Sequence, residues 1–284
     1  MKEKTMEFGM WELPEGCIAH ILSLTSPRDA CRCSAVSSKF RQAAESDTVW
    51  ERFLPCHWKD IISRSVSPAV KFSSKKALFN QLSCSPILLD QGNKSFALDK
   101  VSGKICCTLG SKELSTLWDD DPLVLDGTFP MSYLFPFHIP LKSRFLKVSD
   151  TNAVSYLRIR ARIQSKYLSP NTTYAAYLVY AHRFGGDEYP PMKVLVRLVG
   201  EGDEIKVEEV VNDAYLLTTS VLTSKDDGFC GRSRSDGWME IEVGEFFTRE
   251  DEVEMEIRLW GPIEYTAFVV SGLIVHGIEL RPKD

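Results

Sequence analysis

The sequence predicts a small N-terminal helical unit followed by an antiparallel β-sandwich of jelly-roll type. Two observations over the 284 residues predict this order. Up to about residue 85, apolar residues recur at helical spacing behind capping residues, whereas after residue 89 they alternate with polar ones at a period of two. The charge changes at the same place. Residues 1–88 hold 12 basic and 9 acidic residues, a net of +3, and residues 89–284 hold 22 and 30, a net of −8.

Composition excludes several classes of protein. An apolar fraction of 44% and an aromatic fraction of 11% suffice for a buried core, which excludes a largely disordered chain. The net charge of −5 argues against non-specific DNA binding, which needs a basic face. No apolar run approaches the ~20 residues of a bilayer span, and no apolar stretch of a secretory signal follows the charged start. We expect a cytoplasmic and/or nuclear protein without nucleic-acid or membrane partners.

The first unit is expected to hold four short helices. The first begins at Pro14, which suits the first position of a helix. Its apolar residues fall on one helical face at Cys17, Ile18, Ile21 and Leu22. Capping residues mark three further starts, at Ser26, Ser37 and Asp47. Helices below ~12–15 residues are marginal alone, so periodicity leaves two alternatives open: a bundle within a larger core, or a docking module that depends on a partner.

Residues 11–55 resemble the F-box motif in residue type and spacing, from an opening Leu-Pro to a closing Trp. The matching positions are Leu13, Pro14, Ile18, Ile21, Leu22, Pro27, Asp29, Ala30, Val36, Ser37, Phe40 and Trp50. The resemblance implies docking on a Skp-type adaptor and, through it, on the cullin of a cullin-RING ubiquitin ligase. It also implies that the adaptor interface, or the small core behind it, is formed by Leu13, Pro14, Ile18, Ile21, Leu22, Pro27, Val36 and Trp50.

A connector with helices of its own is expected next. Apolar residues from Trp58 to Ile62 indicate one or two helical turns, and Ser73 is the expected cap of a second helix. Pro86 ends that helix, because the residue before a proline disfavours the helical conformation. We therefore expect an F-box domain over residues 8–55, a helical connector over 56–88 and a third domain over 89–284.

The third domain is expected to be built of strands. Residues 94–99 and 104–109 flank a Ser-Gly turn and predict a hairpin, and residues 111–118 are expected to form a short helix. Alternating or β-branched stretches predict further strands at 157–163, 174–180, 193–199, 238–243, 253–259 and 266–280. Many strands with few helices imply an antiparallel sandwich or jelly roll.

Charged stripes in this domain are interpreted as surface. The arginines at 158, 160 and 162 and the glutamates at 252, 254 and 256 alternate with apolar residues, which predicts solvated strand faces. The alternative for the arginine stripe is a binding site for a phosphate or an acidic partner. Asp119–Asp121 lacks the pattern of a calcium loop and is expected to be a surface turn. Trp238 and Trp260 are predicted to be buried.

Residues with catalytic chemistry form no recognisable site. The five histidines, at 20, 57, 138, 182 and 276, are scattered, and the sequence holds no G-x-S-x-G, HExxH, GxGxxG or P-loop motif. The eight cysteines lack zinc spacing and are expected to be reduced thiols. We predict a protein that is not an enzyme, with no cofactor and no metal.

Several blocks of the third domain resemble, in order, the plant phloem lectin domain (phloem protein two). They lie at residues 94–100, 102–104, 114–118, 168–179, 234–240 and 277–282. With the F-box, the whole chain resembles the plant F-box phloem-lectin subfamily. The resemblance implies a β-sandwich fold and, for the lectin members, binding of N-acetylglucosamine oligomers or related N-glycan cores.

One departure from the lectin pattern concerns sugar binding. Lectin members carry Tyr-Trp-x-Trp shortly after the position of Trp118, whereas this chain has Asp-Pro-Leu-Val-Leu-Asp at residues 121–126. Sugar rings commonly stack on aromatic side chains, so Trp118 is the one aromatic that the resemblance carries over as a carbohydrate-binding residue. Core packing is the alternative for Trp118.

Together these features predict the substrate receptor of a cullin-RING ligase, which binds an adaptor through its helical unit and a target protein, glycoproteins included, through its sandwich. The alternative is a soluble lectin or protein-interaction module that acts without the ligase.

Overall fold

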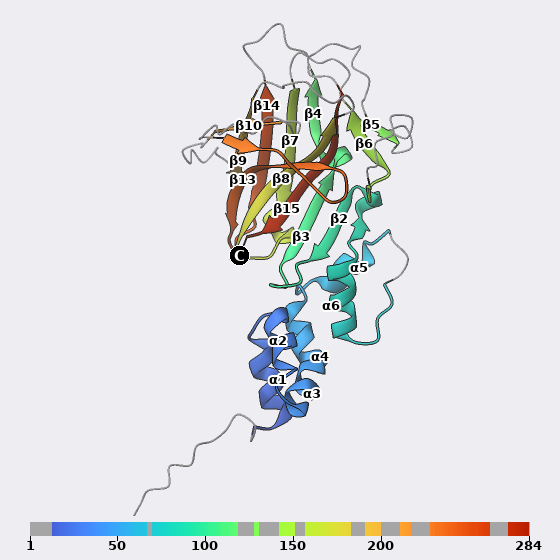
Figure 1. Cartoon of the computed structure of the whole chain (residues 1–284), viewed down its shortest axis with the longest axis vertical. Helices are drawn as coiled ribbons and strands as arrows, with labels where there is room; N and C mark the ends of the chain where they lie inside the picture. Colours follow the sequence, from blue (N-terminus) through green and yellow to red (C-terminus); the bar gives the residue numbers. More distant parts are fainter. Residues whose placement is uncertain are drawn as a thin grey trace, which may run out of the picture. The chain divides into compact units, whose positions relative to one another are not determined.

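The computed structural model describes residues 13–66, 70–118, 128–130, 142–150, 157–182, 191–199, 211–216, 228–261 and 272–283. The chain forms two compact units, one of residues 1–87 and 97–105 and the other of residues 88–96 and 106–284. Helices come first and antiparallel sheets follow, which confirms the expected fold class (Figure 1).

Six α-helices lie in the described part of the first unit. They are α1 (Glu15–Ser23), α2 (Pro27–Cys33), α3 (Ser38–Glu45), α4 (Asp47–Phe53), α5 (Trp58–Ser63) and α6 (Lys75–Cys84). The Ser26 hydroxyl accepts a hydrogen bond from the Asp29 backbone N–H at 3.1 Å, and the Ser37 hydroxyl accepts one from the Phe40 backbone N–H at 3.3 Å. Both predicted caps are therefore confirmed. The other two caps are off by one residue, because Ser46 precedes α4 and Ser74 caps α6.

Helix α1 packs on α3 and α4 and buries Ile18 and Leu22 against them. Trp50 of α4 is also buried, and its indole N–H donates to the Ala44 carbonyl at 2.6 Å. Helix α6 completes this core, since its Phe79 ring lies 5.2 Å from the Trp50 ring. The helical core therefore continues into the predicted connector.

A hairpin tip belongs to the same unit. Gly103 adopts a φ of +74°, a conformation that favours glycine, and a Cβ there would lie 3.2 Å from Pro27 Cγ and 3.3 Å from the Phe53 carbonyl oxygen. The turn between the predicted hairpin strands therefore lies against α2 and α4.

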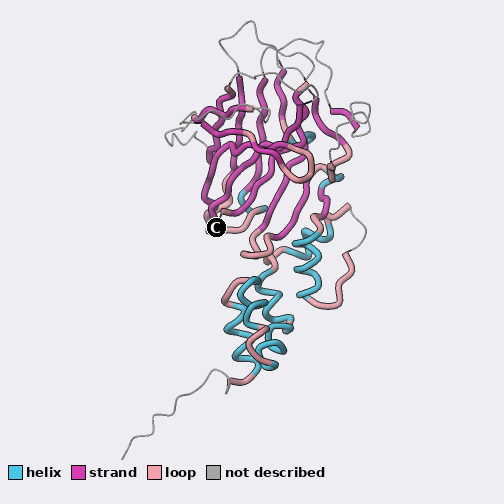
Figure 2. Tube along the Cα trace, viewed as in Figure 1, coloured by secondary structure: helices cyan, strands magenta, loops and turns pink. Residues whose placement is uncertain are grey.

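The described strands form two sheets (Figures 1 and 2). The larger sheet contains β1 (Ile87–Leu89), β2 (Lys94–Leu98), β3 (Ile105–Gly110), β15 (Leu273–Pro282), β8 (Thr172–His182), β13 (Met239–Thr248) and β12 (Arg232–Ser233) in that order, with β6 (Lys147–Asp150) and β5 (Thr128–Pro130) at its side. The smaller sheet runs β11 (Gly228–Cys230), β10 (Asn212–Tyr215), β9 (Met192–Val199), β14 (Glu254–Gly261), β7 (Leu157–Gln164) and β4 (Ser115–Trp118). Strand β10 runs parallel to β11, whereas β9, β14, β7 and β4 pair antiparallel in the smaller sheet, and β8 pairs antiparallel with both β13 and β15 in the larger sheet.

The prediction of a helix over residues 111–118 is wrong. Residues 111–113 form a single 3₁₀ turn, and β4 follows it and pairs with β7 from Ser115 to Trp118. Ladder hydrogen bonds to β7 outweigh the weak stability of a helix of two turns. The hairpin of β2 and β3 is confirmed.

The inward side chains of both sheets share one apolar core. The larger sheet contributes Leu178, Val243 and Ile278, among others, and the smaller sheet contributes Ile159, Val194 and Ile257. This core fixes the register of each strand, since a slip of one residue would turn its apolar side chains outward. Gly277 in β15 is needed for space, because a Cβ there would lie 2.2 Å from the Leu109 carbonyl oxygen.

Candidate functional site

Helix α1 has one broad apolar face, and the fold buries only part of it. Ile18, Ala19 and Leu22 are buried against the neighbouring helices. Pro14, Cys17, Ile21 and Leu24 are exposed, at spacings of three and four residues that place them along one side of the helix. We call these four residues and the exposed Val36 the apolar stripe.

The apolar stripe is unusual for a protein surface. Ile21 is 38% exposed, Leu24 is 60% exposed and Val36 is 70% exposed. Single exposed apolar residues are common, whereas several along one helix favour a protein-binding surface. The candidate functional site of the helical unit is therefore the outer side of α1 with the loop after α2.

The structure divides the eight expected adaptor-binding residues. Pro14, Ile21 and Val36 are exposed, and Leu13 is half-buried. The buried members, which form the core behind the surface, are Ile18, Leu22, Pro27 and Trp50. The expectation omitted Leu24, although the spacing from Pro14 through Cys17 and Ile21 points to it.

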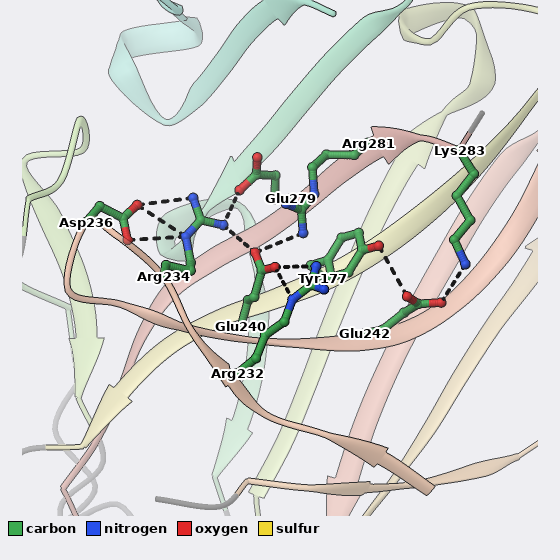
Figure 3. Close-up of polar contacts among 9 residues, drawn as sticks. All are labelled: Tyr177, Arg232, Arg234, Asp236, Glu240, Glu242, Glu279, Arg281 and Lys283. Carbon is green, nitrogen blue, oxygen red and sulfur yellow. Dashed lines mark hydrogen bonds and ion pairs between the residues drawn. The ribbon is translucent and has the colours of Figure 1, made fainter. Parts of the chain in front are cut away.

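A second cluster lies on the outer face of the larger sheet, where three of the family-like sequence blocks meet (Figure 3). Arg234 donates to Glu240 at 2.7 Å and to Glu279 at 2.8 Å, and it also pairs with Asp236. These residues come from the blocks at 234–240 and 277–282. Tyr177 comes from the block at 168–179. The Arg281 guanidinium lies over its ring, with the guanidinium carbon 3.7 Å from the ring centroid.

Glu240 is the centre of this cluster. It is nearly buried and accepts hydrogen bonds from Arg232, Arg234 and Arg281 at 2.6 to 2.8 Å. Burial pushes the Glu240 pKa upward, but the hydrogen bond and charge of Arg281, with those of the other two arginines, outweigh burial and lower the pKa. Glu240 is therefore ionised near neutral pH.

The cluster in Figure 3 balances its own charges. Its four basic residues are Arg232, Arg234, Arg281 and Lys283, and its four acidic residues are Asp236, Glu240, Glu242 and Glu279. Tyr177 donates to Glu242 at 3.2 Å. Because the charged groups are matched with one another, we interpret the cluster as a brace that fixes the segment of residues 232–238 to the sheet.

An aromatic cluster lies beside this brace. The His276 ring lies 4.8 Å from the Trp238 ring and 5.0 Å from the Phe145 ring. Burial, with the Arg144 and Arg234 charges, lowers the His276 pKa to about 3. His276 is neutral at physiological pH and is not poised for proton transfer there.

The remaining predicted residues divide as follows. Trp238 is buried, as predicted, with its indole N–H donating to the Lys142 carbonyl at 2.8 Å, whereas Trp260 is half-buried. The backbone of Trp118 pairs with Leu157 at the end of β4, and its side chain lies outside the described residues. Asp119–Asp121 also lies outside them.

Two other kinds of site are not found in the described part of the chain. No group of three or more histidine, cysteine or acidic side chains there could hold a metal ion. None of the described helices is long and apolar enough to cross a membrane.

Comparisons with known proteins agree with both sequence blocks. The profile of the F-box-like family matches residues 10–55, and that of the phloem protein 2 family matches residues 104–282. The Arabidopsis thaliana F-box protein At2g02240 is 38% identical, over 95% of this chain and 79% of its own length. F-box protein PP2-B10 of the same plant is 35% identical, over 95% of this chain and 92% of its own.

A third relative and one solved structure complete the comparisons. The putative F-box protein PP2-B12 of Arabidopsis thaliana is 37% identical, over 96% of this chain and 98% of its own length. The Clostridium thermocellum xylanase 10B CBM22-1–GH10 modules, solved with xylohexaose, align at 12% identity over 62% of this chain and 27% of theirs. The TM-score of 0.29 is too low for that alignment to carry an argument.

Proposed function

This chain belongs to the family of plant proteins that join an F-box to a phloem protein 2 domain, and from that membership we propose that it is a substrate-recognition subunit of a cullin-RING ubiquitin ligase. Its helical unit would dock on a Skp-type adaptor, which in turn binds the cullin. Its phloem protein 2 domain would hold the target.

The apolar stripe on α1 is the observation that supports this proposal most. The fold buries Ile18 and Leu22 of α1 and leaves the adjoining stripe in water, although each side chain of the stripe would be more stable when buried. Binding energy at protein interfaces is concentrated in a few apolar anchors that become desolvated. Pro14, Ile21, Leu24 and Val36 suit that role, with Leu13 at the edge.

In this proposal the chain acts by proximity. The target is held near the ubiquitin carrier that the cullin recruits, and the effective concentration of its lysines around the carrier rises. Ubiquitin transfer would belong to the partner enzymes, and this chain would contribute two binding surfaces.

Glycan binding is a finer proposal for the same domain. The family resemblance assigns sugar stacking to Trp118, whose neighbours at 121–126 lack the aromatic residues of the lectin members. A soluble lectin or protein-interaction module that works without the ligase is the competing function. It differs in one property, since it requires no adaptor.

Co-expression with a Skp-type adaptor separates the two functions. We expect the tagged chain to co-purify with the adaptor and to recruit the cullin through it. A Leu13→Ala/Pro14→Ala double variant should lose most of the adaptor. A wild-type chain that folds but retains no adaptor would defeat the ligase proposal and favour the competing function.

A further inference from the structure

Residues 142–148, which we call the strap, pack on the larger sheet beside β15. Phe145 and Val148 of the strap are buried, whereas Leu146 between them is 84% exposed. Val148 belongs to a small apolar cluster with Val179, Ala181, Trp238 and Ile274. This cluster is separate from the core that the two sheets share. The strap can therefore leave the sheet while the shared core stays closed.

His276 of β15 lies beneath the strap and has no polar partner there. Its ring lies 5.0 Å from the Phe145 ring and 4.8 Å from the Trp238 ring. The residue is 5% exposed, and neither ring nitrogen has a hydrogen-bond partner among the described residues. A neutral imidazole leaves one donor and one acceptor unpaired at this position, whereas an imidazolium leaves two charged donors unpaired. Closure of the strap therefore requires the neutral ring.

The charged groups that face His276 act mostly against its protonation. Burial is the main cause that lowers its pKa to about 3. The charges of Arg144 in the strap and Arg234 before β13 lower the pKa further, and Asp236 acts in the opposite direction. In register, β6 places Ser149 and β8 places Tyr180 opposite Val275, and neither residue is charged at neutral pH. An imidazolium is therefore poorly stabilised while the strap is closed.

The strap is held by contacts that can break locally. The Lys142 carbonyl accepts from the Trp238 indole N–H at 2.8 Å, and the Lys142 N–H donates to the Asp236 carbonyl at 3.2 Å. Arg144 donates to the Ser95 hydroxyl at 2.9 Å. None of these three hydrogen bonds belongs to the ladder that pairs β15 with β8. Loss of all three leaves that ladder intact.

We propose that the strap is sensitive to acid and is released from the larger sheet when His276 binds a proton. In the released state water reaches the imidazolium and supplies the hydrogen-bond acceptors that the closed state lacks. Release also uncovers the rings of Phe145 and Trp238. The inference goes beyond the proposed function and does not rest on it, since neither the adaptor nor a target takes part in the change.

The size of the effect follows from proton linkage. With the strap open, His276 titrates near its ordinary pKa of 6.5, whereas with the strap closed its pKa is about 3. Between these two values only the open state takes up a proton, so the closed state loses stability as the pH falls. The ratio of open to closed strap should rise about 20-fold from pH 7 to pH 5.

The test is hydrogen–deuterium exchange of the full-length chain, measured by mass spectrometry at pH 7 and pH 5. Each rate is corrected for the intrinsic pH dependence of amide exchange. A peptide that spans the strap reports its opening, and a peptide from the middle of β8 reports opening of the whole sandwich. We expect the strap to exchange much faster than β8 at both pH values. Its corrected rate should rise about 20-fold between them.

Three variants assign the effect to His276. His276→Phe and His276→Gln both remove the titrating group, and in each the corrected rate of the strap should change by about twofold or less between the two pH values. His57→Gln is the matched control, because His57 is a half-buried histidine of the helical unit whose pKa is also lowered by burial. It should keep the full pH dependence. Circular dichroism and a thermal melt establish that each variant is folded.

Two results would overturn the proposal. Equal protection of the strap and of β8 would show that the strap opens only when the whole sandwich unfolds. A 20-fold rise that persists in a folded His276→Phe or His276→Gln variant would show that another group is responsible. Neither result depends on adaptor binding, so failure here is distinct from failure of the ligase proposal.

Discussion

The indole ring of Trp50 lies 5.2 Å from the ring of Phe79, which joins the closing tryptophan of the F-box-like region to helix α6. Two ion pairs reinforce this contact, from Lys75 to Glu51 at 2.9 Å and from Lys76 to Glu45. The backbone N–H of Lys75 also donates to Asp47 at 2.8 Å. The helical unit therefore includes α6 as a structural element.

Removing the Phe79 ring should destabilise the helical unit. Phe79→Ala opens a cavity beside Trp50, and we expect a loss of about 3 kcal/mol in the free energy of unfolding. Urea denaturation followed by tryptophan fluorescence measures the loss. Phe72→Ala is the control, because Phe72 is an exposed phenylalanine of the same unit and its removal should cost about 1 kcal/mol or less. Equal losses in the two variants would contradict the role of Phe79.

Glu240 should matter more to stability than its exposed neighbour Glu245. Glu240→Ala leaves three guanidinium groups without their shared carboxylate, and we expect a loss of about 3 kcal/mol. Glu245→Ala removes an exposed partner of Lys283 and should cost about 0–1 kcal/mol. Thermal melts of both variants test this difference, and a similar small loss in both would show that the brace contributes little.

His276 should make the protein less stable in mild acid. The unfolded chain takes up a proton as the pH falls through 6.5, whereas buried His276 remains neutral down to about pH 3. The free energy of unfolding therefore falls as the pH falls through this window, by up to ~1.4 kcal/mol per pH unit. Denaturation at pH 7 and pH 5 measures the slope.

His276→Phe provides the comparison for that slope. The variant should have a shallower pH dependence between pH 7 and 5 than the wild type. Glu256 does not complicate the comparison, since its pKa is lowered from 4.5 to about 2 and its contribution is lost only below pH 4.5. Parallel slopes in the two proteins would show that His276 is not the group responsible.

Sugar binding by the phloem protein 2 domain is tested through Trp118. If the tryptophan stacks on a sugar ring, Trp118→Ala should abolish binding to N-acetylglucosamine oligomers on a glycan array. Trp260→Ala on β14, which is separated from β4 by β7, is a comparison of equal size. Sugar binding that survives Trp118→Ala would remove that residue from the site.

Local sequence rules predicted most of the helices and strands. Capping at Ser26 and Ser37 and the alternation of Leu157 to Ile163 depend on residues close in sequence, and both are confirmed. The prediction for residues 111–118 failed because their conformation depends on pairing with β7, which lies about 40 residues further along the chain. The predicted cap at Asp47 is one residue off for a similar reason. The Asp47 carboxylate accepts a hydrogen bond from the backbone N–H of Lys75 in α6, a residue far away in the sequence.

The candidate surfaces were only partly predictable for the same reason. The F-box pattern predicted eight adaptor-binding residues as one set, and only the structure separates the exposed Ile21 and Val36 from the core residue Ile18. The glutamate stripe of β14 was expected to be solvated, and that prediction is wrong for Glu256. It is buried because arginines from β7 and β9 converge on it, and no single strand reveals that convergence.

The most direct test of the ligase proposal is calorimetric titration of a Skp-type adaptor into wild-type chain, Ile21→Asp and Phe247→Asp. Phe247 of β13 is an exposed apolar residue outside the stripe and serves as the matched control. We predict that the wild type and Phe247→Asp bind alike, whereas Ile21→Asp binds at least about 30-fold more weakly, as expected for an interface anchor. Unchanged binding by a folded Ile21→Asp variant would contradict the assignment of the apolar stripe as the adaptor surface.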